Sequence, residues 1–299
     1  MNNELLKGIW FAVGAYLLWG VLPLFWKLLQ MIPSDEILSH RIVWSFVFVM
    51  LIVAVSGRSN EFKSLFVHRK VLLALLLASV LISGNWFIYI WAVNHDYVIE
   101  ASLGYYINPL LNVALGMIVL KERLTLPQWV AILLAATGVA ILAVEYGKVP
   151  WIALLLAISF AIYGLVKKMA PVDAMVGLAF ETAMSTPAAL IYLMLLQTKG
   201  IGALGHSSAE VTVYLLLSGI ATTLPLIWFA QGAKRIPFSM LAFIQYLSPT
   251  ISLLLGIFVF HEPFTAIHLI SFSFIWAAIV IYTLSSVKFR DAIKLKSES

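Results

Sequence analysis

The residues best suited to chemistry in this sequence are uncharged hydrogen-bonding side chains set into apolar text. They form two rows, Tyr105, Asn108 and Asn112, and Gln245, Ser248 and Ser252. Members of each row lie three and four residues apart, the spacing that places side chains on one face of an α-helix. Amides and hydroxyls on one face either line a cavity for a polar organic solute or simply hold neighbouring helices together. Two such rows favour the cavity.

Each row also contains a proline, Pro109 in the first and Pro249 in the second. A proline has no backbone N–H, so a carbonyl one turn earlier loses its partner. Interrupted helices often form binding sites near the middle of a membrane. We therefore predict one helix break in each row.

Aromatic and amide side chains elsewhere extend the candidate site. They are Asn85, Trp86, Tyr89, Trp228 and Gln231. Aromatic walls with a few amides suit an organic solute better than a bare ion. The alternative is that some of these rings belong to the aromatic belts at the membrane surfaces.

Two charged residues, Arg41 and Glu181, fall inside apolar stretches, and His40 lies next to the first. A charge near the bilayer centre costs several kcal/mol, so each needs a partner or a wet cavity. Arg41 either binds an anionic substrate group or fixes backbone carbonyls. Glu181 and His40 either titrate during a coupled cycle or make structural hydrogen bonds. Arg41 and Glu181 differ in expected depth by roughly 12 Å, which argues against a direct pair.

Other kinds of chemistry lack the residues they need. The chain has no cysteine and only six scattered histidines, which excludes thiolate chemistry and predicts neither a metal site nor catalytic residues. Segment 200–205 matches a Gly-x-Gly-x-x-Gly pattern, but it follows no expected strand and lacks the phosphate-loop lysine. We expect no cofactor, no ATP, no nucleic acid and no enzymatic activity.

The elements that position these residues are expected to be membrane-spanning helices. Of 299 residues, 62% are hydrophobic and 11% are charged, against about 25% charged in soluble domains. Apolar stretches of about 20 residues recur between the charges. They run near 8–29, 36–56, 71–93, 100–120, 127–144, 150–166, 174–196, 211–231, 239–259 and 266–286. The predicted fold class is an all-α integral membrane protein with ten transmembrane helices.

Basic residues predict the orientation of these helices. With the amino terminus in the cytoplasm, 15 of the 19 Lys and Arg residues fall in inner segments, three in outer segments and Arg41 in a span. This agrees with the positive-inside rule, so both termini are expected in the cytoplasm. The connection over residues 197–210 is the one long outer segment, and its Gly and Ser content predicts mobility.

An internal repeat links the two rows. Residues 101–141 align without a gap with residues 241–281, with eight identities that include Tyr106/Tyr246, Pro109/Pro249 and Glu122/Glu262. Five helices per repeat is an odd number, so the second copy crosses the membrane in the opposite sense. We expect two inverted repeats, residues 1–146 and 147–299, around a central cavity within one membrane domain. Glu122 and Glu262 are expected to cap the helices that follow them.

Several local motifs resemble a known family. They occupy residues 33–41 (Pro-Ser-Asp-Glu-Ile-Leu-Ser-His-Arg), 84–86 (Gly-Asn-Trp), 100–110 (Glu-Ala-Ser-Leu-Gly-Tyr-Tyr-Ile-Asn-Pro-Leu), 163–168 (Tyr-Gly-Leu-Val-Lys-Lys) and 245–250 (Gln-Tyr-Leu-Ser-Pro-Thr). The sequence resembles the RarD proteins of the EamA branch of the drug/metabolite transporter superfamily. That resemblance implies ten helices in inverted repeats, a bacterial inner-membrane location, and peripheral fifth and tenth helices.

These observations predict a secondary transporter that moves a small organic metabolite by alternating access. The solute is expected to be amino-acid-like, aromatic or drug-like, and the other partner is the lipid bilayer. A membrane channel is the main alternative, and an intramembrane lipid-modifying enzyme is a weaker one.

Overall fold

The computed structural model describes residues 3–94, 97–147, 149–259 and 265–297, and every regular element in these ranges is a helix. The helices are α1 (Asn3–Lys27), α2 (Ser34–Val55), α3 (Ser59–Ser64), α4 (Arg69–Asn94), α5 (Val98–Ile118), α6 (Leu126–Tyr146), α7 (Trp151–Met169), α8 (Ala174–Thr198), α9 (Ala209–Arg235), α10 (Phe238–Gln245), α11 (Leu247–Phe258) and α12 (Ala266–Ser297).

Nine helical segments in the described ranges are long and apolar enough to cross a membrane. They are α1, α2, α4, α6, α7, α8, α9, the combined α10–α11 segment and α12. Helix α5 adds a shorter apolar stretch over Leu103–Ile118. Each of the ten expected spans therefore has a counterpart, and the prediction of an all-α integral membrane fold is confirmed.

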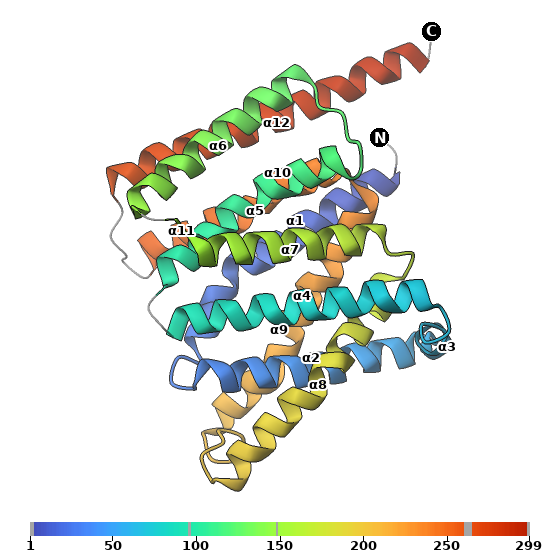
Figure 1. The fold of residues 1–299 in the computed structure, drawn as a ribbon, viewed down its shortest axis with the longest axis vertical. Helices are drawn as coiled ribbons and strands as arrows, with labels where there is room; N and C mark the ends of the chain where they lie inside the picture. The colour runs from blue at the N-terminus through green and yellow to red at the C-terminus, as the bar shows by residue number, and fades with distance from the viewer. Residues whose placement is uncertain (1–2, 95–96, 148, 260–264, 298–299) are drawn as a thin grey trace.

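Helices α6 and α12 lie side by side along one edge of the molecule, at the top of the view (Figure 1). In addition to this mutual contact, α6 packs on α5 and α12 packs on α10. Their contact is tight at Gly138, where a Cβ atom would come within 2.6 Å of the Ser271 carbonyl oxygen. The peripheral position expected for the fifth and tenth spans agrees with this arrangement.

The two ends of the bundle carry different connections (Figure 1). The start of α1, the end of α12 and the short helix α3 lie toward the right of the view, whereas the turn over residues 28–33 lies at the left. The sequence does not predict helix α3, because five of its six residues are polar and it lies within a connection. The first described residues of α1 and the last of α12 thus lie at the same end of the bundle (Figure 1).

An ion pair ties α3 to the start of α8. Arg58, just before α3, lies 2.8 Å from the Asp173 carboxylate and also pairs with Glu61. Asp173 caps α8 by accepting a hydrogen bond from the Met175 amide at 2.8 Å. Partial burial acts to raise the pKa of the Asp173 carboxyl, but the hydrogen bonds from Arg58 and Met175 outweigh burial and hold that pKa below its ordinary value.

A glycine lets α9 cross closely over α2. A Cβ atom at Gly219 would overlap the backbone of Trp44, so a larger residue cannot stand there without moving a helix. The Ser45 hydroxyl donates to the Gly219 carbonyl at 3.2 Å across the same crossing. This close approach is what brings the next turn of α9, with Thr222, against the arginine on α2.

Candidate functional site

Three amide side chains form a buried cluster where α5 meets α10. The Asn108 Oδ1 atom accepts from Gln245 Nε2 at 2.6 Å and from Asn112 Nδ2 at 3.1 Å. Asn112 Nδ2 also donates to Gln245 Oε1 at 2.9 Å. All three residues are buried. The two rows predicted from the sequence therefore meet, and they do so through amides from opposite halves of the chain.

The amide cluster is attached to two further helices. The Tyr16 hydroxyl of α1 donates to Gln245 Oε1 at 3.4 Å, and Asn108 Nδ2 donates to the Ala157 carbonyl of α7 at 2.6 Å. Asn112 Oδ1 is buried without a hydrogen bond to a described residue. A buried acceptor of this kind costs stability, and such exceptions often mark functional positions.

The remaining members of the rows have other surroundings. The Ser252 hydroxyl donates to the Gly20 carbonyl of α1 at 3.3 Å. Ser248 is half-buried and has no hydrogen bond to a described residue. Asn85 on α4 donates to the Leu156 carbonyl and to the Ser159 hydroxyl of α7, each at 2.9 Å. Asn85 and Ser252 thus connect helices, the alternative considered for the polar rows.

The two prolines behave differently. A short break at Tyr246 separates α10 from α11, one turn before Pro249, as expected. Pro109 instead lies inside an uninterrupted α5, so the prediction of a break there is wrong. One lost hydrogen bond is tolerated in a helix when its neighbours hold the backbone. Here the Tyr246 hydroxyl donates at 3.3 Å to the carbonyl of Tyr106, the residue after the one whose carbonyl Pro109 leaves without its helix partner.

Arg41 on α2 contacts aromatic rings of α1 and α4 and a hydroxyl of α9. Its guanidinium carbon is 4.5 Å from the centre of the Trp26 ring and 5.4 Å from that of Trp86. Its Nε donates to the Thr222 hydroxyl at 3.0 Å. Tyr89 and Tyr105 are close enough to Arg41 to interact with it electrostatically.

Glu181 has partners of its own on α7. Its carboxylate lies 2.7 Å from the Lys167 ammonium and accepts from the Tyr163 hydroxyl at 3.1 Å, with all three residues buried. Arg41 and Glu181 thus have separate partners, in line with their difference in depth. Lys167 is one of the 15 basic residues that the charge count places in inner segments, and that count does not predict its burial. Its position four residues after Tyr163, on one helix face, was the available signal.

A cavity beside Glu181 is small. Its volume of about 10 Å³ has room for roughly one water molecule. Its lining includes Trp86 and the hydroxyls of Ser83 and Ser185, which are 2.5 Å apart. A pocket for a drug-sized ligand measures several hundred Å³. This cavity is therefore far too small to hold the predicted organic solute.

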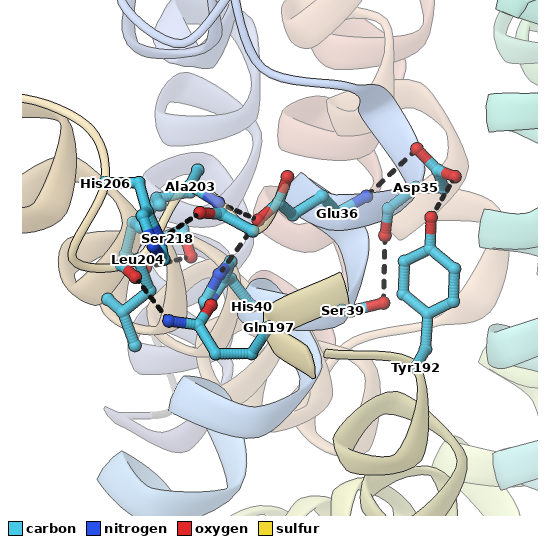
Figure 2. Close-up of polar contacts among 12 residues, drawn as sticks. Asp35, Glu36, Ser39, His40, Tyr192, Gln197, Ala203, Leu204, His206 and Ser218 are labelled. Atoms are coloured by element: carbon cyan, nitrogen blue, oxygen red, sulfur yellow. Dashed lines mark hydrogen bonds and ion pairs between the residues drawn. The ribbon is translucent and has the colours of Figure 1, made fainter. Parts of the chain in front are cut away.

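His40 belongs to a cluster at the start of α2 (Figure 2). Its Nδ1 accepts from the Trp44 indole N–H at 3.2 Å, and its Nε2 lies 3.9 Å from the Glu36 carboxylate. Because an indole can only donate, the neutral ring must carry its proton on Nε2. Glu36 also accepts from the Ala203 amide at 2.6 Å, so the 197–210 connection is fastened to α2, although its composition predicts mobility.

Glu122 caps a distant helix. Its carboxylate accepts from the Phe238 and Ser239 amides at 2.6 and 3.0 Å and from the Ser239 hydroxyl at 2.7 Å, all at the start of α10. At the start of α6, the helix that follows Glu122, the Gln128 side chain instead accepts from the Thr125 amide at 2.8 Å. Glu122 thus caps a helix, as predicted, but that helix is α10 and not α6, which follows it in the sequence. Glu262 lies outside the described residues.

Trp228 and Gln231 lie away from the amide cluster, near the amino-terminal part of α1. The Trp228 ring packs over Gly14 and lines a groove of about 330 Å³ with Lys7, Trp10 and Phe11. Gln231 accepts from Arg235 one turn later on α9. The sequence pattern could not separate these residues from the cluster, because an aromatic residue and an amide three residues apart are also what a binding site would contain.

The sequence profile of the EamA-like transporter family matches this chain twice, over residues 6–144 and 148–284. The chain belongs to the EamA-like transporter family. This family is a family of transporters and not a class of enzymes. No group of three or more His, Asp or Glu side chains that could hold a metal ion occurs among the described residues.

Several bacterial relatives in this family are similar over nearly their whole length. The chain is 46% identical to the uncharacterized transporter YojE of Bacillus subtilis, covering 98% of this chain and 99% of the relative. It is 40% identical to the protein RarD of Escherichia coli, covering 94% and 95%. A crystal structure aligns with 93% of this chain and 97% of its own, with a TM-score of 0.71 and 19% identity, a likeness of fold alone. The chain is a multi-pass membrane protein and a transporter.

Proposed function

We propose that this protein is a secondary transporter that moves a small organic solute across the bacterial inner membrane by alternating access. Its two moving parts are residues 1–146 and 147–299, arranged as inverted repeats. The solute passes between them at the level of the amide cluster of Asn108, Asn112 and Gln245. No ATP is consumed at this site.

The observation that carries the proposal is the amide cluster itself. It is buried, uncharged and shared between α5 and α10, which come from the two separate family matches. A hydrogen bond of this kind contributes about 0.5–1.5 kcal/mol net, so a solute amide or hydroxyl can replace one at small cost. The cluster therefore suits a closure that opens and re-forms during a cycle.

The surrounding backbone supports such movement. The break between α10 and α11 lies directly after Gln245, so α10 can tilt without bending α11. The Glu122 carboxylate holds the other end of α10 through two amides and a hydroxyl. If the hydrogen bonds at one end of α10 break while those at the other end form, α10 has two alternative positions.

The orientation is part of the proposal. The positive-inside rule predicts that both termini are in the cytoplasm, and the position of the described ends of α1 and α12 at one end of the bundle supports this proposal (Figure 1). Because the chain contains no cysteine, single cysteines can be introduced without background labelling. R123C should react with an impermeant maleimide only from the cytoplasmic side and T265C only from outside. Labelling of both from one side would overturn the inverted arrangement.

Transport itself is tested with the solute found by metabolite profiling. Cells that lack the protein and cells that overproduce it are compared, and the compound that changes most is supplied in radiolabelled form to proteoliposomes. The N108L/Q245L double variant should lose flux while remaining monodisperse. Full flux in this variant would contradict the site, and unitary current steps in planar bilayers would indicate the alternative, a channel.

A further inference from the structure

Arg41 carries a charge that the described protein does not neutralise. No carboxylate in the described part of the chain lies within 4.0 Å of its guanidinium. Two buried carboxylates, Glu36 on the same helix and Glu181 on the neighbouring α8, have other partners, since Glu181 pairs with Lys167 and Glu36 accepts from the Ala203 amide. A buried or half-buried cation in a spanning helix is costly without an anion.

The guanidinium is held so that one edge stays available. Its Nε donates to Thr222, whereas neither terminal nitrogen makes a hydrogen bond to a described residue. Neither of these nitrogens is among the buried polar atoms without a partner, so both face accessible space. Two terminal nitrogens side by side present the fork of donors that matches the two oxygens of a carboxylate.

Aromatic rings lie close to the guanidinium. Trp26 and Trp86 stack near the guanidinium, and the Tyr89 and Tyr105 rings lie 6.0 Å apart at an angle of 62°. Tyr105 is 48% exposed although α5 packs against four other helices. Its ring therefore borders open space. The phenol hydroxyls of Tyr89 and Tyr105 also have no hydrogen bond to a described residue.

We propose that Arg41 is the binding site for the carboxylate group of the transported solute, with Trp26, Trp86, Tyr89 and Tyr105 enclosing its apolar body. This inference rests on the proposed transport function and names its substrate class, a small organic monocarboxylate. A single positive charge among apolar rings suits one negative charge. A phosphate group would require more cations or backbone amides than are found here, and a cationic solute would be repelled.

The site joins the two proposed moving parts. Arg41, Trp26 and the α4 and α5 rings belong to residues 1–146, whereas Thr222 belongs to residues 147–299. A carboxylate bound at Arg41 neutralises the one charge that resists closure of the rings around it. Solute binding and closure would then favour each other.

The test uses the full chain in lipid nanodiscs and isothermal titration calorimetry. The probes are phenylacetate, its neutral amide phenylacetamide, the amine phenethylamine and inorganic phosphate. Phenylacetate should bind wild-type protein most tightly. R41Q should weaken phenylacetate binding by roughly tenfold to a hundredfold, the range for a lost charge-assisted hydrogen bond, without changing phenylacetamide binding.

Two further variants distinguish the loss of a binding group from a general loss of structure. R41K keeps the charge but not the fork of donors, so it should bind phenylacetate with intermediate affinity. R235Q is the matched control, because Arg235 also lies 5.6 Å from an aromatic ring but already pairs with Glu4, and its loss should leave phenylacetate binding unchanged. Each variant is compared with wild type by gel filtration.

Three results would overturn the inference. They are equal binding of phenylacetate and phenylacetamide, wild-type affinity for phenylacetate in R41Q, and phosphate binding tighter than any carboxylate. Absence of phenylacetate binding at millimolar concentration would overturn it as well. If R123C and T265C still label from opposite sides and a non-carboxylate solute is transported, the proposed function stands and only the substrate class fails.

Discussion

The buried pair of Lys167 and Glu181 allows a quantitative test of how this bundle tolerates charge. Their side chains are 4% and 1% exposed, and the two charged atoms are 2.7 Å apart. At an effective dielectric constant of 20 their attraction is roughly 6 kcal/mol, which offsets a desolvation cost of several kcal/mol per ion. Removing one partner leaves the other charge buried and alone.

We therefore expect E181Q and K167M each to lower the free energy of unfolding by about 3–5 kcal/mol. The double variant K167M/E181Q should lose much less than the sum of the two, because no uncompensated charge remains. Reversible unfolding in bicelles gives the three values, and the double-mutant cycle gives the coupling energy.

The matched control is the more exposed pair of Arg58 and Asp173, whose side chains are 26% and 21% exposed. D173N should cost only about 1 kcal/mol, since solvent screens that pair. Additive losses at Lys167 and Glu181, with no coupling, would refute the view that these residues neutralise each other inside the bundle.

Three further outcomes follow from local geometry. G219A should reduce the yield of monodisperse protein through its overlap with α2, whereas G84A, with no atom within 4 Å of its added Cβ, should not; equal yields in gel filtration would contradict the crossing. E122A should destabilise the start of α10 by about 1–2 kcal/mol and E122Q by less, as seen in amide hydrogen exchange of the α10 amides. Because the pKa of Asp173 is lowered in the folded state, its contribution to stability is present above the unfolded pKa and is lost as pH falls through the folded value; unfolding measured as the pH is lowered should therefore show a smaller loss of stability in D173N than in wild type.

The sequence predicted the features that depend on composition and on depth in the membrane. Long apolar stretches predict spanning helices whatever their packing, and the different depths of Arg41 and Glu181 argued against a pair between them. Amide side chains at Asn108 and Gln245 also had to face protein, because lipid offers them no partner.

Contacts between distant segments were not predictable in the same way. Glu122 caps a helix that begins 116 residues later, and no local pattern identifies that partner. The burial of Lys167 depends on the rotation of α7, which charge counting does not detect. Pro109 and Pro249 occupy equivalent positions in the sequence alignment, yet only the second follows a break, because the neighbours of each helix decide whether it stays straight.

The pairing of α6 with α12 has a mechanical consequence. Helices α6 and α12 pack on each other at the edge of the bundle, whereas the amide cluster joins α5 and α10 in the interior. We therefore expect the two halves to rotate relative to each other about the contact between α6 and α12. A covalent bridge between α6 and α12 should then leave turnover intact, whereas a bridge between α5 and α10 should arrest it.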